Sequence, residues 1–155
     1  MAKQRSKKCI YNGMEFDSLV ERDFYKVLEN RQENGEIFNL RIQEKYILQE
    51  GFRLNNGEKI QAITYSADQV WEDKEGVTHI CDTKGSEFNI EQTFLVKYKM
   101  LKNLHRDFIY HIVIRYDGIW YDLLNKESKK LYKEAKAIKK AEKKLKSKKK
   151  KTMKK

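Results

Sequence analysis

Residues 59–84 read KIQAITYSADQVWEDKEGVTHICDTK, and this stretch decides the fold. Its two β-prone runs, Lys59–Trp71 and Val77–Lys84, flank a short polar segment that ends in Gly76. A glycine at the end of a three-residue loop can take the left-handed conformation that such a hairpin needs. We therefore predict an antiparallel hairpin with its loop at residues 74–76.

The register of this hairpin determines whether two aspartates face each other. If Asp73 pairs with Val77, Asp68 falls opposite Asp82; a four-residue loop would shift the pairing by one position. Side chains alternate along a strand, so Asp82 and Lys84 point to the same face. Carboxylates that face each other across a ladder repel, and a divalent cation between them would remove the repulsion.

The elements around the hairpin follow from apolar periodicity and from helix-end signals. Ser18 and Glu21 have the spacing of a capping box, which places the start of the first helix. The expected elements are a helix over 18–31, β-rich pieces over 37–54, the two hairpin strands, a helix over 89–104, and strands over 107–116 and 119–121. This order predicts an α+β or α/β domain on a central mixed sheet.

Length and composition exclude several classes of protein. A chain of 155 residues suits one domain, and its two cysteines, Cys9 and Cys81, are too far apart for a disulfide framework or a cysteine-rich zinc module. The sequence has no apolar run near the roughly 18 residues that span a bilayer, no signal-peptide core and no glycine-rich phosphate loop. We expect a soluble cytoplasmic protein with no membrane partner.

The three histidines do not predict a zinc site. His79 and Cys81 project to the strand face opposite Asp82, and His105 and His111 belong to other elements. The spacing therefore does not bring enough zinc ligands together.

The net charge of +11 is concentrated at the two ends of the chain. From Asn125 onward there are 16 lysines and three glutamates, whereas residues 9–124 sum to about −6. We expect a flexible basic arm over 1–9, a domain over 10–124 and a lysine-rich tail over 125–155. The tail is expected to be helical over 128–145 and disordered over 148–155, and one helical stripe holds Leu131, Ala135, Ile138 and Leu145. Basic ends on an acidic body predict a polyanionic partner.

The hairpin residues resemble the motif of the PD-(D/E)xK nuclease superfamily. Asp68 and the run Asp82-Thr83-Lys84 lie on adjacent strands, and a helix bearing Glu21 precedes them. Ala67 stands where that motif has proline, a departure that leaves its chemical groups in place. The element order is also similar to the α-β-β-β-α-β core of that superfamily. Residues 10–122 further resemble a phage and prophage family of small nuclease-like proteins of unassigned role, through the segments FDSLVE (16–21), YSAD (65–68), DTKG (82–85) and FLVKYK (94–99).

The resemblance implies a restriction-endonuclease-like α/β fold and a site for Mg²⁺, with Mn²⁺ as a substitute. Asp68, Asp82 and the carbonyl of Thr83 would hold the ion, with Glu21 bound directly or through water. The ion would polarise the phosphate and activate a water molecule, while Lys84 would orient that water or steady the developing charge. Lys97 or Lys99 would contact the phosphate backbone.

Simpler interpretations of the same residues stay open. Glu21 can act as the acidic member of the capping box, and this does not prevent it from binding a metal. Lys84 can merely pair with Asp82. Ordinary surface positions are the alternative for Asp68, Asp82, Lys97 and Lys99.

These expectations together predict a Mg²⁺-dependent endonuclease that hydrolyses DNA. By analogy, it would serve phage or prophage DNA metabolism in a bacterial host and prefer branched or recombination DNA. The basic ends would hold the DNA backbone, the tail through Lys139, Lys140, Lys143 and Lys144. The alternatives are a noncatalytic DNA-binding protein on the same fold and an RNA-binding or RNA-processing protein. A solubility role for the tail and a homodimer also stay open.

Overall fold

A five-stranded mixed sheet forms the centre of the molecule, in the order β3-β6-β7-β8-β9. The structure is a computed structural model that describes the backbone of residues 7–152 and the side chains of residues 7–147. The sheet strands are β3 (Phe38–Gln49), β6 (Ile63–Glu72), β7 (Thr78–Lys84), β8 (Ile109–Tyr116) and β9 (Ile119–Asp122). Strands β7 and β8 are parallel and the other neighbours are antiparallel, so the predicted mixed sheet is confirmed.

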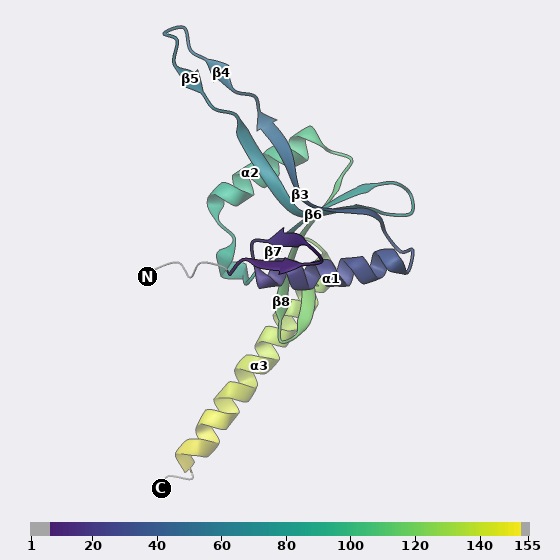
Figure 1. Cartoon of the computed structure of the whole chain (residues 1–155). Helices are drawn as coiled ribbons and strands as arrows, with labels where there is room; N and C mark the ends of the chain where they lie inside the picture. The colour runs from purple at the N-terminus through teal and green to yellow at the C-terminus, as the bar shows by residue number, and fades with distance from the viewer. Residues whose placement is uncertain (1–6, 153–155) are drawn as a thin grey trace.

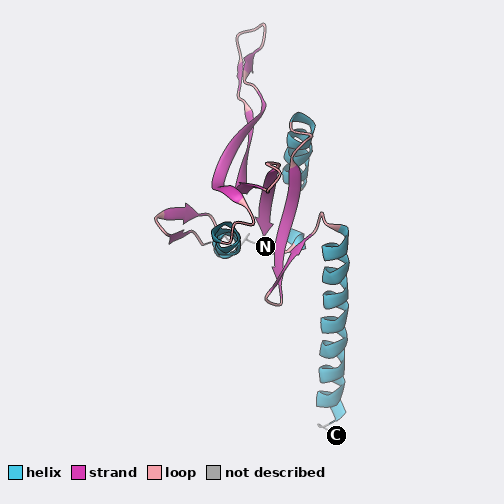
Figure 2. Ribbon diagram, turned by 90° about the vertical axis from the view of Figure 1, so that its right-hand side faces the viewer, coloured by secondary structure: helices cyan, strands magenta, loops and turns pink. Residues whose placement is uncertain are grey.

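Two helices cover the two faces of this sheet (Figure 2). Ile80 and Ile112 belong to the core cluster that includes Tyr98 of α2 (Gln92–Leu104). Their sequence neighbours Cys81 and Val113 belong to a second cluster, with Phe24 and Leu28 of α1 (Leu19–Glu33). Because neighbouring strand residues point to opposite faces, α1 and α2 must lie on opposite sides of the sheet.

The β6–β7 hairpin has the predicted loop and register. The N–H of Gly76 donates to Asp73 O at 3.0 Å, and Gly76 takes the left-handed conformation with φ of +78°. Trp71 pairs with His79, and the ladder continues in the same register to Gln69 and Cys81. The three-residue loop is therefore confirmed, and the four-residue alternative is wrong.

Two small hairpins extend the predicted architecture. One is formed by β1 (Cys9–Tyr11) and β2 (Met14–Phe16), so the basic arm does not extend as far as residue 9; residues 1–6 lie outside the described part of the chain. The other, β4 (Phe52–Arg53) with β5 (Lys59–Ile60), prolongs the β3–β6 pair into a projecting arm (Figure 1). The second helix starts at Gln92 rather than at 89, because residues Glu87–Asn89 form a separate 3₁₀ turn, η1.

The C-terminal helix α3 (Lys126–Thr152) is longer than predicted and projects from the domain (Figure 1). The expectation of disorder is wrong for residues 148–152; residues 153–155 lie outside the described part. The run 126–152 has no glycine or proline and is rich in lysine, alanine and glutamate, all compatible with a continuous helix. No helix among the described residues has the length and apolarity needed to cross a bilayer.

The base of α3 packs on the sheet mainly through Tyr132, and of the expected stripe only Ala135 packs there. Tyr132 is 4% exposed and contacts a cluster with Ile114 and Tyr121, and Ala135 packs beside it. Leu131, by contrast, is 58% exposed. Ile138 and Leu145 are each 61% exposed, so the predicted apolar stripe lies mostly in solvent and does not anchor the helix.

Candidate active site

Asp82 and Lys84 lie near the end of β7, on the face that α2 covers. Asp82 is 4% exposed, and its Oδ1 accepts a hydrogen bond from the Tyr65 hydroxyl at 3.1 Å. Its Oδ2 is paired with Lys84 Nζ, and no hydrogen bond of regular geometry reaches this oxygen from the described residues. Lys84 Nζ also lies 4.3 Å from the ring centroid of Phe94. The predicted common face of Asp82 and Lys84 is confirmed.

Asp68 lies on β6, one residue beyond the last regular pair of the β6–β7 ladder. Its Oδ2 accepts the backbone N–H of Thr83 at 2.7 Å, so its carboxylate closes the gap that the separating strands leave. Burial and the nearby charges of Asp82 and Glu21 raise the pKa of Asp68 well above its ordinary value. The two aspartates are thus electrostatic neighbours, although the ladder ends at Gln69 and Cys81 and does not include them as a regular cross-strand pair.

Opposite Asp68, the edge strand β3 contains an unusual residue. Gln43 has φ of +52°, and the β3–β6 ladder runs Ile42 with Gln69 and then Glu44 with Ala67, without a regular pair between them. Ala67 packs in the α2-side cluster, whereas Gln69 bonds to the backbone of α1. The alternation of side chains along β6 therefore inverts at Asp68, which turns this carboxylate towards β7.

Glu21 takes the capping role that the sequence predicted, and it also lies in the electrostatic field of the two aspartates. Ser18 Oγ accepts the Glu21 N–H at 3.1 Å, and Glu21 accepts hydrogen bonds from the Ser18 hydroxyl at 2.9 Å and from the Asp17 N–H at 3.2 Å. This is a capping arrangement at the start of α1. Burial raises the pKa of Glu21, and the charges of Asp17 and Asp82 add to the rise. Glu21 therefore caps the helix while it shares the electrostatic field of the two aspartates.

Gln69 holds these parts together and was missed by the sequence analysis. Its side chain is fully buried; Nε2 donates to Glu21 O at 3.2 Å, and Oε1 accepts from Thr83 Oγ1 at 2.9 Å. One amide thus ties the start of α1 to the end of β7. Glutamine on a β-prone run carries no sequence signal for this role. Tyr65 is buried, and it also bonds to Asp82.

Residues 1–118 match the family described as "Protein of unknown function (DUF1064)". The chain belongs to this family. The family match includes Glu21, Asp68, Asp82 and Lys84, whereas α3 lies outside it. Comparisons with curated proteins and with solved structures give no match.

The family-matched site offers hard oxygen donors, which suit Mg²⁺ better than a soft metal. Asp82 Oδ2 is buried without a regular hydrogen bond, and burial together with the charges of Asp82 and Glu21 raises the pKa of Asp68; both features favour a bound cation. As arranged, however, no three His, Cys, Asp or Glu side chains within residues 7–147 converge into a metal-binding group. Lys84 occupies the position beside Asp82 Oδ2, so an ion bound there would have to displace its ammonium group.

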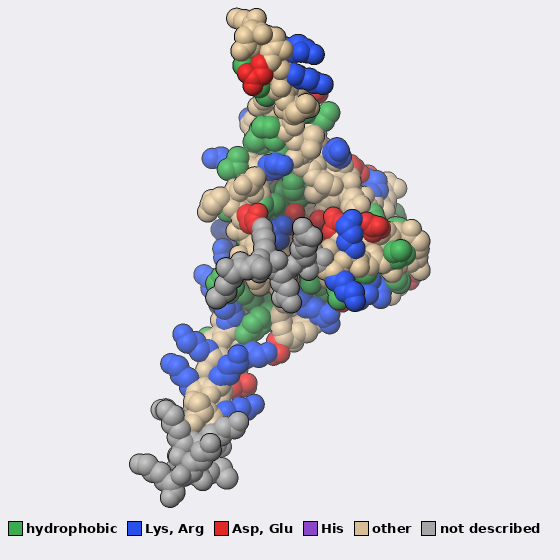
Figure 3. Space-filling model, turned by 60° about the vertical axis from the view of Figure 1, so that its left-hand side comes forward, with side chains coloured by type: hydrophobic (Ala, Val, Ile, Leu, Met, Phe, Trp, Pro, Cys, Tyr) green, Lys and Arg blue, Asp and Glu red, His purple; other side chains and the backbone are tan. Residues whose placement is uncertain are grey.

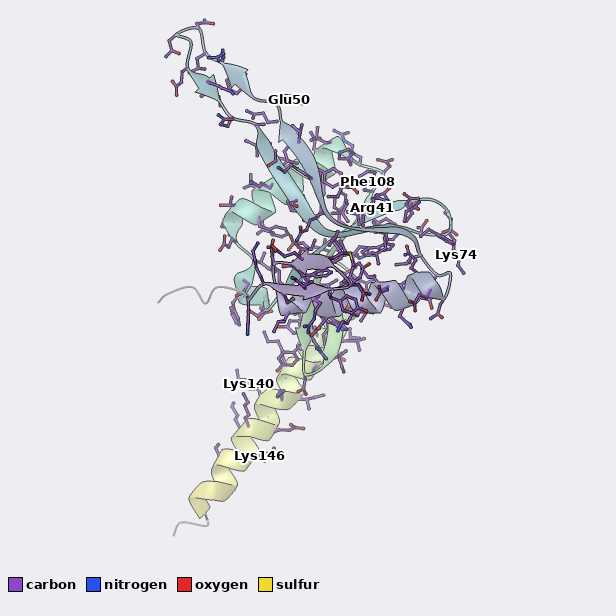
Figure 4. All side chains as sticks on the ribbon, in the orientation of Figure 1. Arg41, Glu50, Lys74, Phe108, Lys140 and Lys146 are labelled. Carbon is purple, nitrogen blue, oxygen red and sulfur yellow. The ribbon has the colours of Figure 1, made fainter. Side chains whose placement is uncertain are left out.

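The predicted DNA-contacting lysines lie outside this cluster. On α2, Lys97 is half-buried and Lys99 is exposed. Figures 3 and 4 show lysines along α3, where Lys139, Lys140 and Lys143 line a hollow beside Tyr116 and Lys144 is exposed. Lys139 is already paired with Asp117, which reduces its availability to a phosphate.

Proposed function

We propose that this chain is a Mg²⁺-dependent deoxyribonuclease that hydrolyses phosphodiester bonds, with Mn²⁺ able to replace Mg²⁺. The observation that carries the proposal is the gathering of Glu21, Asp68 and Asp82 with Lys84 where β6 and β7 separate. Buried carboxylates of like charge repel each other, and this costs stability. A bound cation would offset the repulsion and is the simplest reason for a protein to keep these carboxylates together.

The proposal includes a restriction-endonuclease-like fold. The succession α1, β3, β6, β7, α2, β8 follows the α-β-β-β-α-β order of that fold, with the antiparallel hairpin before the parallel β7–β8 pair. The carboxylates and Lys84 sit on β6, β7 and the start of α1, which are the elements that carry the motif in that superfamily. This agreement of order and motif supports the assignment.

Each residue has a role that its surroundings suit. Asp68, Asp82 and the Thr83 carbonyl would hold Mg²⁺, with Glu21 reached directly or through water. The ion, when bound, supplies Lewis-acid polarisation of the phosphate and a more acidic water. Tyr65 fixes one oxygen of Asp82 by its hydrogen bond.

Lys84 would act by a short movement of its ammonium group from Asp82 towards the phosphate. Its ammonium group now neutralises Asp82, and the Phe94 ring holds its side chain on the same face. If a cation were held by Asp82, this ammonium group would be released from that pair and could steady the charge that develops on the phosphate. Lys97 or Lys99 and the lysines of α3 would bind the DNA backbone without reading sequence. By analogy of fold, branched or recombination DNA of a phage or prophage is the proposed substrate.

One observation favours a second candidate, a noncatalytic DNA-binding protein. Asp82 is neutralised by Lys84, and Asp68 accepts the Thr83 N–H, so both aspartates have partners without any metal. In that case the cluster would be a structural ion pair beside a strand end.

A cleavage panel separates the candidates. Linear, nicked, flapped and four-way DNA, and matched RNA, are incubated with the full chain with and without Mg²⁺. Cleavage that requires Mg²⁺ and disappears in Asp82→Asn, but persists in the exposed-carboxylate control Asp107→Asn, supports the nuclease. Binding without cleavage on every substrate supports the noncatalytic protein, and cleavage of RNA alone redirects the proposal to RNA processing.

A further inference from the structure

Four titratable side chains form a continuous hydrogen-bonded chain on the α1 face of the sheet. Asp73 Oδ2 lies 3.1 Å from His79 Nε2, His79 Nδ1 lies 2.8 Å from His111 Nε2, and His111 Nδ1 lies 2.7 Å from Asp122 Oδ2. Every ring nitrogen of the two histidines therefore has a partner. None of these residues takes part in the proposed nuclease site.

The two imidazole rings meet edge to edge. Their planes differ by 9° and their centroids are 5.1 Å apart, yet the two facing nitrogens are only 2.8 Å apart. Nearly parallel rings whose nitrogens are so much closer than their centres lie side by side, not face to face. The indole of Trp71, which is 4% exposed, lies nearly parallel to both rings, with centroids 5.2 Å from His79 and 5.1 Å from His111.

The number of protons that this arrangement needs can be counted. An ionised carboxylate only accepts, so each contact with an aspartate needs one N–H on the histidine. The contact between the two rings needs one further hydrogen. Three protons on four nitrogens make one neutral imidazole and one imidazolium. With both rings neutral one contact has no hydrogen, and with both rings charged two N–H groups oppose each other.

We propose that His79 and His111 share a single extra proton at neutral pH, and that this proton ties the β6–β7 turn to the base of α3. The proposal does not rest on nuclease activity. At one end, Asp73 Oδ1 also accepts the Glu75 and Val77 N–H groups, and so shapes the turn that carries Lys74 (Figure 4). At this end, the shared proton is therefore connected through Asp73 to the β6–β7 turn.

At the other end, the network reaches the connection between β9 and α3. Asp122 Oδ1 accepts the N–H of Leu124 at 2.9 Å and that of Ile112 at 3.3 Å. The N–H of Asp122 itself donates to Ser128 Oγ in the first turn of α3 at 2.8 Å. Loss of the shared proton would leave Asp122, half-buried, with a weakened partner at this connection.

The surrounding charges allow one proton and oppose two. Hydrogen bonding to His79 lowers the pKa of Asp73. The pKa of Asp122 is also lowered: burial raises it, but the hydrogen bonds with His111 and with the backbone outweigh burial. Burial lowers the pKa of His79, and the charges of His111 and of Arg31 on α1 act in the same direction, against the pull of Asp73. The geometry thus accommodates one shared proton on the pair, with an N–H directed at each aspartate.

Cys81 and Tyr98, two further titratable groups near the network, do not supply charge. Burial raises the pKa of the Cys81 thiol and of the Tyr98 phenol, so both stay neutral, and the Tyr98 hydroxyl donates to His111 O at 2.7 Å. The face of the Trp71 indole is electron-rich and stabilises a cation that lies over it. No third metal ligand converges on the histidines within residues 7–147, so a proton is the cation that fits between them.

The sign of the pH dependence follows from proton counting. Above about pH 6.5 both histidines are neutral in the unfolded chain, whereas the folded chain holds one proton. This stabilisation is present near neutral pH and is lost as pH rises through the apparent pKa of the folded pair. Well below about pH 6.5 the unfolded chain binds two protons and the folded chain only one, so the contribution falls again. The apparent values belong to the pair, not to one ring.

Nitrogen-15 NMR of the full chain tests the proton count. The chain has three histidines, so His105, which lies outside the network, serves as an internal control. At pH 7 we expect one charged ring and one neutral ring whose hydrogen is on the nitrogen that faces its aspartate, and a pair that loses its proton at a higher pH than His105 does. Two neutral rings at pH 7, or two independent titrations that match His105, would overturn the proposal.

Amide hydrogen exchange tests the structural tie. At pH 7, His111→Gln should increase exchange in the first turn of α3 about tenfold, the effect of losing one charge-assisted hydrogen bond. His105→Gln should leave it unchanged. The wild type should show the same increase at alkaline pH after correction for intrinsic exchange, which decides the matter even if the His111 variant does not fold. Unchanged protection at the base of α3 across this pH range would contradict the proposed connection between the histidine pair and α3.

Discussion

At the scale of single residues, the site depends on how buried carboxylates are balanced. Asp82 has one oxygen bound to Tyr65 and the other paired with Lys84, while Asp68 accepts the Thr83 N–H. Each contact offsets part of the desolvation cost, but the raised pKa of Asp68 shows that the balance is incomplete. The two aspartates should therefore respond differently to substitution.

Asp82→Asn is expected to reduce Mg²⁺-dependent cleavage by about 100-fold or more, because it removes the charge that anchors the ion and balances Lys84. DNA affinity should stay the same or rise slightly, since one negative charge is lost next to a polyanion. Single-turnover cleavage and a binding titration in Ca²⁺ measure the two effects separately. A variant that cuts at the wild-type rate would remove Asp82 from the mechanism.

Asp68→Asn is expected to stabilise the metal-free protein by about 1 kcal/mol at pH 7, because it relieves repulsion from Asp82 and Glu21. The folded-state pKa of Asp68 is raised, so its ionisation costs stability as pH rises above its unfolded value of about 3.9. The advantage of the variant should be largest at neutral pH and shrink on acidification.

Thermal melts of both proteins at several pH values, with and without Mg²⁺, check this prediction. Mg²⁺ should stabilise the wild type more than Asp68→Asn. Equal responses to Mg²⁺ would mean that this carboxylate does not hold the ion.

At the scale of elements, the site depends on an irregular pair of strands. Gln43 sits in the left-handed region opposite Asp68, and the inversion of β6 at that point aims the carboxylate at β7. Left-handed backbone costs an ordinary residue roughly 1 kcal/mol or more. The strain at Gln43 is thus part of how the sheet builds the site.

Gln43→Val should destabilise the protein by about 1–2 kcal/mol, because a β-branched side chain fits the left-handed conformation worst. Gln43→Gly should cost little or stabilise, since glycine takes positive φ freely. Lys45→Val, at an exposed and regularly paired position of β3, is the matched control and should be nearly neutral. Urea denaturation measures all three. A Gln43→Val protein as stable as the control would contradict the left-handed backbone.

The hairpin shows what the sequence could and could not predict. Loop length, glycine position and β-propensity determine the register locally, so the neighbourhood of Asp68 and Asp82 was predictable. The capping box at Ser18 and the apolar face of α2 are local patterns too. The inversion at Gln43 was not predictable, because no glycine or proline marks it and tertiary contacts impose it.

The Gln69 bridge and the histidine pair were missed for a related reason. Gln69 bonds to Glu21, which lies 48 positions away in the sequence, and His79 meets His111 only because β7 and β8 are parallel neighbours. Such contacts depend on which strands become neighbours, and strand order is not encoded in any short segment. His79 and His111 belong to separate elements, as predicted from the sequence, but those elements lie side by side in the sheet.

At the scale of the whole molecule, an acidic cluster on the domain is combined with a lysine-rich helix that projects from it (Figure 1). The base of α3 is part of the folded domain, because Tyr132 is buried and Lys136 pairs with Glu87. Among residues 140–147, whose side chains the structure describes, none belongs to a core cluster, and Leu145 is 61% exposed. The two parts of α3 should therefore be separable by truncation.

Deletion of residues 140–155 is expected to weaken DNA binding without changing the chemistry. It removes ten lysines and one glutamate, which lowers the formal net charge from +11 to +2. It keeps Tyr132 and Lys136, so the fold should survive; a longer deletion from Glu127 would uncover Ile114 and Tyr121.

Each lost phosphate contact lowers the slope of log affinity against log salt by roughly 0.9 on duplex DNA. Only some of these lysines can reach phosphates together, so we expect the magnitude of the slope to fall by about 3–6.

Binding titrations at several salt concentrations measure this slope, and the loss of affinity should be the same for unrelated sequences, because backbone contacts carry no base information. The cleavage rate at saturating DNA should change little, since Glu21, Asp68, Asp82 and Lys84 all belong to the domain. A control with the same ten lysines changed to arginine keeps the charge and should keep the slope. An unchanged slope after truncation would mean that the distal helix does not bind DNA. A collapsed rate at saturation would mean that it helps to build the active site, and the separation of binding from chemistry would then be wrong.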